Sequence, residues 1–166
     1  MMFIPRSLFV LSTLLLAAPW LAAQSQKKYD GPRPPKPDVP YLLHARHLVE
    51  TDVTEAKEEK LKNDLRYTLP GTAKARTPLM EPIFLMQSDK LVPEKLTCYR
   101  MEVKNGQREL TISAKAKRDS SARPRRLTVT LVGDKLFKIE VAEALDNGEY
   151  VLTPEGSNQS FAFSVY

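Results

Sequence analysis

Cysteine, tryptophan and glycine are scarce in this sequence of 166 residues, which contains one, one and six of them respectively. The single cysteine, Cys98, excludes an internal disulfide, so a hydrophobic core must hold the fold together. The six glycines form no phosphate-binding loop, and no serine stands in a nucleophile elbow. No base lies near Cys98 in the sequence to generate a nucleophilic thiolate. We therefore expect neither catalytic residues nor an enzyme activity.

Histidine occurs only twice, at His44 and His47. Three positions apart on a helix, the two imidazoles could approach one metal ion. No cysteine or third histidine accompanies them, and the neighbouring Arg46 opposes a cation. We therefore predict no metal and no cofactor, and a metal-dependent protein or enzyme that uses this pair is the weakest alternative.

The only long apolar run lies near the N-terminus and is too short to cross a membrane. It covers residues 8–18, whereas a membrane-spanning helix needs about 20 apolar residues. A positive charge, Arg6, precedes the run, and the small-residue segment 21–23 follows it. This order is typical of a cleavable secretory signal. We predict a signal peptide over residues 1–23, a mature N-terminus near Gln24, and a secreted or periplasmic product without a transmembrane span.

Proline is concentrated in the segment that follows. Five of the 13 prolines fall within residues 24–40, among lysine and arginine residues. Proline removes backbone donors and favours the extended polyproline II conformation. We interpret this segment as a stiff linker between the cleavage site and the fold, with a docking ligand for a proline-binding partner as the alternative. Residues 41–166 then form one domain.

Alternating apolar residues and turn signals predict that this domain is all-β. Asn105-Gly106 is the strongest hairpin signal, because both turn positions require positive φ. In the resulting register Met101 faces Leu110 on an apolar face. Cys98 falls on the polar face of the same hairpin, opposite Ser113.

Two further hairpins are expected, one through Gly133-Asp134 between residues 125–132 and 135–141, and the last through residues 154–159. Seven or eight short strands at a spacing of about 8–12 residues indicate a β-sandwich or a barrel. The charged stretch over residues 50–64 is interpreted as a short solvated helix or a charged connection between strands. An acidic binding face is the alternative for that stretch.

Residues 145–152 resemble the corner that precedes the penultimate strand of immunoglobulin-like domains. Asp146, Gly148 and Tyr150 occupy the positions of that motif, in which the tyrosine hydroxyl bonds back to the corner backbone. Leu152 stands where antibody domains carry their second disulfide cysteine, so the resemblance is to disulfide-free members of the fold. It implies an immunoglobulin-like β-sandwich of seven to eight strands. The mature chain is also similar to small, uncharacterised exported bacterial proteins, and this resemblance implies no functional residues.

Positive charge is densest in a segment that we name the basic segment, residues 115–126. Its six cations are Lys115, Lys117, Arg118, Arg123, Arg125 and Arg126. Such a cluster could hold an anionic glycan, a lipid head group or nucleic acid. No aromatic residue is interleaved for base stacking, and export separates the chain from nucleic acid. We interpret the segment as a solvated loop between hairpins, with binding of an anionic glycan or lipid surface as the alternative.

The sequence therefore favours an exported, non-catalytic interaction or structural module, since this type of fold does not specify a partner. Another envelope protein is one candidate partner. An anionic glycan or lipid surface, bound through the basic segment, is the second candidate. Nucleic acid is not expected.

Overall fold

The computed structural model describes residues 29–113 and 122–166. The described residues form thirteen strands and one short 3₁₀ helix, η1 (Pro93–Lys95). None of their helices is long and apolar enough to span a membrane. The strands are β1 (Tyr41–His44), β2 (His47–Glu50), β3 (Asp52–Glu55), β4 (Lys57–Lys60), β5 (Asp64–Pro70), β6 (Arg76–Thr77), β7 (Ile83–Gln87), β8 (Leu96–Lys104), β9 (Gln107–Ser113), β10 (Leu127–Gly133), β11 (Leu136–Val141), β12 (Gly148–Pro154) and β13 (Gln159–Val165).

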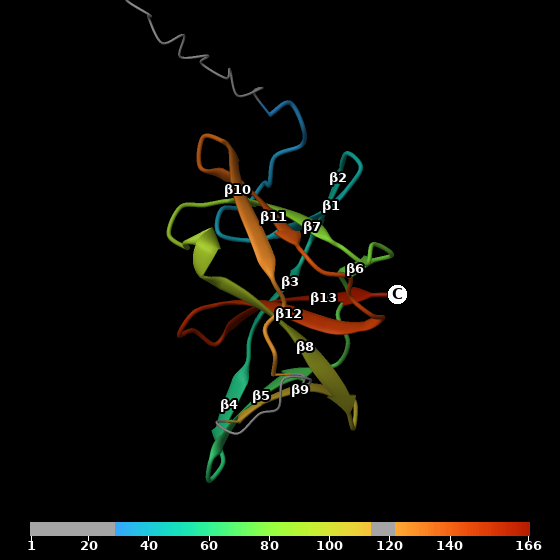
Figure 1. Cartoon of the computed structure of the whole chain (residues 1–166), viewed down its shortest axis with the longest axis vertical. Helices are drawn as coiled ribbons and strands as arrows, with labels where there is room; N and C mark the ends of the chain where they lie inside the picture. The colour runs from blue at the N-terminus through green and yellow to red at the C-terminus, as the bar shows by residue number, and fades with distance from the viewer. Residues whose placement is uncertain (1–28, 114–121) are drawn as a thin grey trace, which may run out of the picture.

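These strands form two sheets that pack against each other (Figure 1). The five-stranded sheet has the order β10-β11-β7-β1-β2. The eight-stranded sheet has the order β3-β13-β12-β8-β9-β5-β4, and β6 adds to β13. Every strand pairing is antiparallel except that of β6 with β13. The predicted all-β sandwich is confirmed.

The main core lies between the two sheets. Phe84 of the five-stranded sheet packs edge-on against Phe163 of the other sheet, with ring centroids 5.0 Å apart. Tyr150 stacks on the same Phe163 at 5.5 Å, and all three side chains are almost completely buried. Aromatic pairs in these geometries add to the stabilisation that comes from apolar burial. This cluster therefore joins the two layers of the sandwich.

The eight-stranded sheet is strongly curved, because its two edge strands follow each other directly in the chain. β3 and β4 lie at opposite ends of the strand order, yet only Ala56 separates them in sequence. The concave side of this curved sheet lies in the lower half of Figure 1. It holds a second, smaller apolar cluster of Leu69, Ala73, Met101, Leu110, Val151 and Ala162. The domain thus has two cores, one on each side of the same sheet.

Neither the short helix nor the plain connection considered for residues 50–64 is correct. This segment forms β3, β4 and the start of β5, and Glu58 of β4 pairs with Tyr67 of β5. An i,i+4 ion pair such as Glu58–Lys62 stabilises a helix by only about 0.2–0.5 kcal/mol, whereas strand pairing satisfies a row of backbone groups. All four residues of β4 are exposed, which suits a charged edge strand.

The described residues also contain more strands than the seven or eight predicted. Five of them, β2 to β6, lie between β1 and β7. These short strands include the charged edge strand β4 and the two-residue β6. The charged residues of β3 and β4 show little apolar alternation because much of their surface faces solvent, so the pattern did not reveal these two strands.

Cys98 does not lie on a polar face as the hairpin register predicted. β8 pairs with β9 only over residues 102–104. Before that point β8 pairs with β12, and Cys98 forms a bridge with Arg125 rather than with Ser113. Both faces of β8 are therefore covered, with Cys98 completely buried in the main core and Met101 in the second cluster.

The C-terminal part of the predicted linker is packed on the domain. Pro37 forms a β-bridge with Gln87. The Asp38 carboxylate accepts hydrogen bonds of 2.9 Å from the backbone N–H groups of Asp89, Lys90 and Leu91. Burial acts to raise the pKa of Asp38, but these hydrogen bonds outweigh it and lower that pKa. The domain contacts therefore begin before residue 41.

Candidate binding cavity

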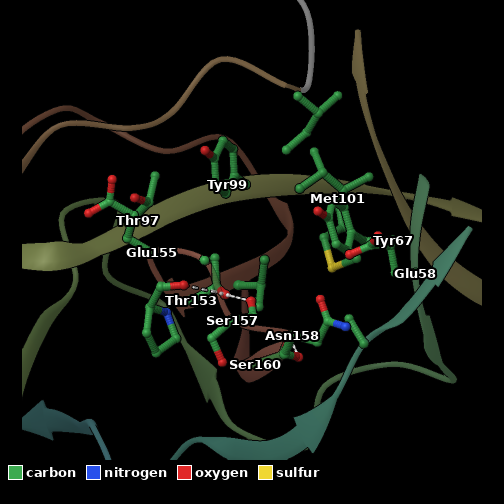
Figure 2. Close-up of a pocket in the computed structure, with 16 residues that line it drawn as sticks. Glu58, Tyr67, Thr97, Tyr99, Met101, Thr153, Glu155, Ser157, Asn158 and Ser160 are labelled. Carbon is green, nitrogen blue, oxygen red and sulfur yellow. Dashed lines mark hydrogen bonds between the residues drawn. The ribbon is translucent and has the colours of Figure 1, made fainter. Parts of the chain in front are cut away.

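A cavity of about 280 Å³ opens on the concave side of the curved sheet (Figure 2). It lies where β8 and β9 separate after their short pairing, and its inner wall is apolar. The wall comes from alternate residues of neighbouring strands, because every second side chain of a strand points to the same face. These apolar residues are Met101 of β8, Leu110 and Ile112 of β9, and Val151 of β12.

The mouth of the cavity is polar. Much of it belongs to the turn between β12 and β13, residues 155–158. Thr153 Oγ1 lies 3.2 Å from the carbonyl oxygen of Ser157 and 2.8 Å from that of Gln159, which holds this turn in place. Two carboxylates line the cavity, Glu58 and Glu155. Among the described residues that line the cavity, these two carboxylates are the charged side chains.

Two tyrosines, Tyr67 and Tyr99, also line the cavity. Burial raises the pKa of Tyr67, and the nearby Glu58 raises it further. Burial also raises the pKa of Tyr99. Both phenols therefore stay neutral at physiological pH, and each offers a ring face and a hydroxyl to an occupant of the cavity.

An ion pair lies deeper on the same concave face. Arg108 continues the alternation of Leu110 and Ile112 along β9 and is only 3% exposed. Its Nη1 atom lies 3.6 Å from Glu149 Oε2, and its Nη2 atom donates to the carbonyl oxygen of Pro70 at 2.9 Å. The two charges offset each other in a buried setting where an unpaired charge would be costly. This pair therefore does not make the cavity cationic.

The two histidines lie on strands β1 and β2 and not on a helix. His44 and His47 are directly paired across a two-residue hairpin turn, so they face each other at its tip. The described residues contain no group of three or more histidine, cysteine, aspartate or glutamate side chains that could hold a metal ion. The structure thus adds no third ligand to the two that the sequence offered.

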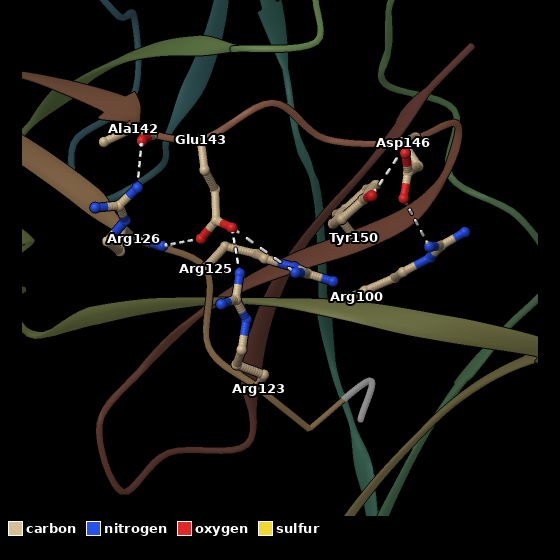
Figure 3. Close-up of polar contacts among 8 residues, drawn as sticks. All are labelled: Arg100, Arg123, Arg125, Arg126, Ala142, Glu143, Asp146 and Tyr150. Carbon is tan, nitrogen blue, oxygen red and sulfur yellow. Dashed lines mark hydrogen bonds and ion pairs between the residues drawn. The ribbon is translucent and has the colours of Figure 1, made fainter. Parts of the chain in front are cut away.

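Three arginines of the basic segment converge on one carboxylate (Figure 3). Glu143 forms an ion pair with Arg123 and lies 3.8 Å from Arg125. Its Oε1 atom also accepts the backbone N–H of Arg126 at 2.8 Å. Glu143 therefore offsets part of the positive charge that the sequence suggested was available. The remaining cations of the segment, Lys115, Lys117 and Arg118, lie outside the described residues.

The corner hydrogen bond predicted for Tyr150 is confirmed (Figure 3). The hydroxyl of Tyr150 donates to the carbonyl oxygen of Asp146 at 2.8 Å. Arg100 contacts the same corner, with its guanidinium 3.4 Å from the Asp146 carboxylate and 3.2 Å from the carbonyl oxygen of Asn147. A Cβ atom on Gly148 would stand 3.3 Å from that guanidinium. The corner is therefore a structural element that fixes the entry to β12.

The cavity is the feature that the sequence pattern did not identify. The sequence contained one indication of this cavity. Leu96 and Cys98 lie on one face of β8, and Tyr99 and Met101 lie on the other, so both faces are largely apolar. A strand with two apolar faces requires a second covering layer. The other walls come from β5, β9, β12 and the β3–β4 junction, and their meeting depends on the curvature of the sheet.

The chain matches no protein-family model, no curated protein and no solved structure.

Proposed function

We propose that this chain is an exported, non-catalytic binding module with an immunoglobulin-like sandwich, and that it binds the apolar part of a ligand in the cavity of the curved sheet. The observation that carries the proposal is the cavity itself, which combines an apolar wall with a polar mouth. Ligand sites are typically concave and mostly apolar, with a few polar groups that orient the ligand.

Strand order supports the immunoglobulin-like assignment. Sandwiches of that type carry strands A, B, E and D in one sheet and C, F and G in the other. The order β1-β7-β11-β10 corresponds to A-B-E-D, and β8-β12-β13 corresponds to C-F-G. The tyrosine corner precedes β12, as it precedes strand F in that fold. On this assignment, β2 to β6 and β9 are additions, and β4, β5 and β9 among them line the cavity.

The proposed export rests on the N-terminal sequence. Residues 1–23 have the charged start, apolar run and small-residue exit of a secretory signal, and they lie outside the described residues. The module would then act in the periplasm or outside the cell. A surface that binds polyanions through the basic segment is less well supported, because Glu143 already pairs with its arginines.

The chemistry of the lining indicates a ligand whose apolar body carries no negative charge. Glu58 and Glu155 would repel an anion, whereas the rings of Tyr67 and Tyr99 can accept an alkyl chain or a cationic group. Because both carboxylates are exposed, their effect on affinity should be modest and should weaken with salt.

The test is binding of a neutral fluorescent probe, N-phenyl-1-naphthylamine, to the mature chain, residues 24–166. Ile112→Trp places a large ring in the cavity, whereas Thr111→Trp adds the same ring on the opposite face of the same strand. We expect saturable binding to the unmodified chain and to Thr111→Trp, with a loss of at least about tenfold, or roughly 1.4 kcal/mol, for Ile112→Trp. Unfolding midpoints of both variants show whether each is folded.

Competition with matched amphiphiles then tests the ligand class. Decyltrimethylammonium and decanoate carry similar alkyl chains and opposite charges. We expect the cation to displace the probe at lower concentration, and Glu58→Gln combined with Glu155→Gln to reduce that difference. If the unmodified chain binds no probe, or if both tryptophan variants bind equally well, the cavity is not a ligand site.

A further inference from the structure

β10 is an edge strand of the five-stranded sheet among the described residues. It pairs with β11 on one side and with no other strand of the described residues on the opposite side. Its first six residues are Leu-Thr-Val-Thr-Leu-Val, with no charge and no proline. Native proteins usually protect such edges with charged residues, proline or strong bulges, because unpaired backbone groups recruit other strands. The edge strand β4, by contrast, has the sequence Lys-Glu-Glu-Lys.

The direction of the free backbone groups follows from the hydrogen bonds at the start of the strand. Ala142 N donates to the carbonyl oxygen of Arg126 at 2.9 Å, so the backbone of Arg126 points toward β11. Because this direction alternates in an antiparallel ladder, the N–H and C=O groups of Leu127, Val129 and Leu131 point outward. None of these three residues has a backbone partner among the described residues on that side.

The outward edge is self-complementary. Residues 127–131 read Leu-Thr-Val-Thr-Leu in both directions. An antiparallel partner with the same sequence, centred on Val129, would therefore place leucine opposite leucine and threonine opposite threonine. A two-fold symmetric interface places residue i opposite residue j and j opposite i, so a strand with this symmetric sequence pairs like with like on both sides of the axis.

We propose that β10 pairs antiparallel with β10 of a second copy of this chain, with the two-fold axis at Val129, which joins the two five-stranded sheets. The paired segment ends naturally, because a register shift between Leu131 and Gly133 marks a bulge. Leu131, whose side chain is 55% exposed, would be covered by Leu127 of the second copy.

Charges at the ends of the strand favour the same register. Exposed Arg126 of one copy would lie at the same end of the paired segment as exposed Asp134 of the second copy, which follows the bulge. The two opposite charges favour this register, and the symmetry axis repeats the arrangement. The cavity lies on the other sheet, so this interface is independent of the proposed ligand binding.

A charge exchange at the two exposed threonines tests the pairing. Thr128 would lie opposite Thr130 of the second copy, and both side chains are exposed. We expect the mature chain to dimerise in sedimentation velocity. The variant Thr128→Lys/Thr130→Lys, and separately Thr128→Glu/Thr130→Glu, should each dissociate at least tenfold more readily, since like charges would then face each other. An equimolar mixture of the two variants should recover the dimer as a heterodimer.

A matched control separates this register from a general effect of charge. Thr72→Lys/Gln107→Lys adds the same two charges at exposed positions on other parts of the surface and should dimerise like the unmodified chain. A monomer at all concentrations up to about 0.5 mM would overturn the proposal. Equal dimerisation of the lysine variant, or failure of the mixture to recover the dimer while both variants stay folded, would also overturn it.

Cross-linking gives a second measure of the register. The facing positions 128 and 130 would form a non-hydrogen-bonded pair, with Cα atoms about 4.5 Å apart, a separation that a disulfide spans. Mixing Thr128→Cys with Thr130→Cys under oxidising conditions should give a disulfide-linked dimer in much higher yield than either variant alone. Equal yields from the mixture and from the single variants would contradict the proposed axis.

Discussion

The hydrogen bond at the corner before β12 allows a quantitative test of the fold. Tyr150→Phe removes one hydroxyl and leaves the ring, which is 1% exposed and stacked on Phe163, in place. The lost bond is the 2.8 Å contact from Tyr150 to the carbonyl oxygen of Asp146. Leaving a buried acceptor unpaired costs about 1–3 kcal/mol. Because the Asp146 side chain is 83% exposed, water can partly reach this corner, and we expect a loss of about 1–2 kcal/mol.

Urea unfolding measures this loss directly. With a denaturant slope of about 2 kcal/mol per molar, the midpoint should fall by roughly 0.5–1 M with the slope unchanged. Tyr99→Phe is the matched control, because the hydroxyl of Tyr99 makes no hydrogen bond to any described residue, and its midpoint should stay within about 0.2 M of the unmodified chain. If the midpoint of Tyr150→Phe does not move, or if both variants lose the same amount, the hydroxyl does not stabilise the corner.

Two further predictions concern Asp38 and Cys98. Hydrogen bonds lower the pKa of Asp38 in the folded protein. The ionised carboxylate therefore stabilises the fold at pH values above the unfolded pKa of about 3.9. This stabilisation is lost as the pH falls through the lower pKa of the folded state. Asp38→Asn should therefore cost about 1 kcal/mol at pH 7 and progressively less below pH 4 in urea unfolding, whereas a pH-independent difference would contradict the assignment. Burial raises the thiol pKa of Cys98 to about 12, so a thiol reagent at pH 8 should label it only after denaturant is added, and rapid labelling of the native chain would show that it is accessible.

The hairpin through Asn105-Gly106 was predictable close to its turn. Asn105 and Gly106 both adopt positive φ, and the pairing of Glu102 with Glu109 is the register that the sequence predicted. The next hairpin was placed one residue too early. Its turn lies at Asp134-Lys135, with Lys135 at a φ of 50°. A bulge after Leu131 absorbs the extra residue, and nothing in the local composition of that strand marks a bulge.

The alternation of apolar residues in the sequence could not predict the curvature of the larger sheet. This curvature depends on β3 and β4, which end up at opposite edges of the sheet although only Ala56 separates them. Their charged residues favour solvent and therefore carry no periodic apolar signal. Met101 was assigned to the apolar face of a hairpin whose other face is polar, and in the fold it lines the cavity. The sequence therefore indicated that residues such as Met101 and Leu110 are buried, but it did not indicate that they line a cavity.

The distribution of charge in the fold differs from its distribution in the sequence, because folding brings together charged residues that are distant in the chain. The basic segment is the densest run of positive charge, yet its described arginines are drawn together by Glu143, which is 17 to 20 residues away in the chain. Conversely, the cavity mouth of this chain of net charge +5 is lined by two carboxylates and by no basic side chain of the described residues. Local electrostatics decides which ligands a cavity accepts, because screening confines the influence of exposed charges to about 10 Å at 0.1 M salt. A ligand class inferred from the mouth of the cavity therefore outweighs one inferred from the net charge, and the two inferences predict opposite preferences between decyltrimethylammonium and decanoate.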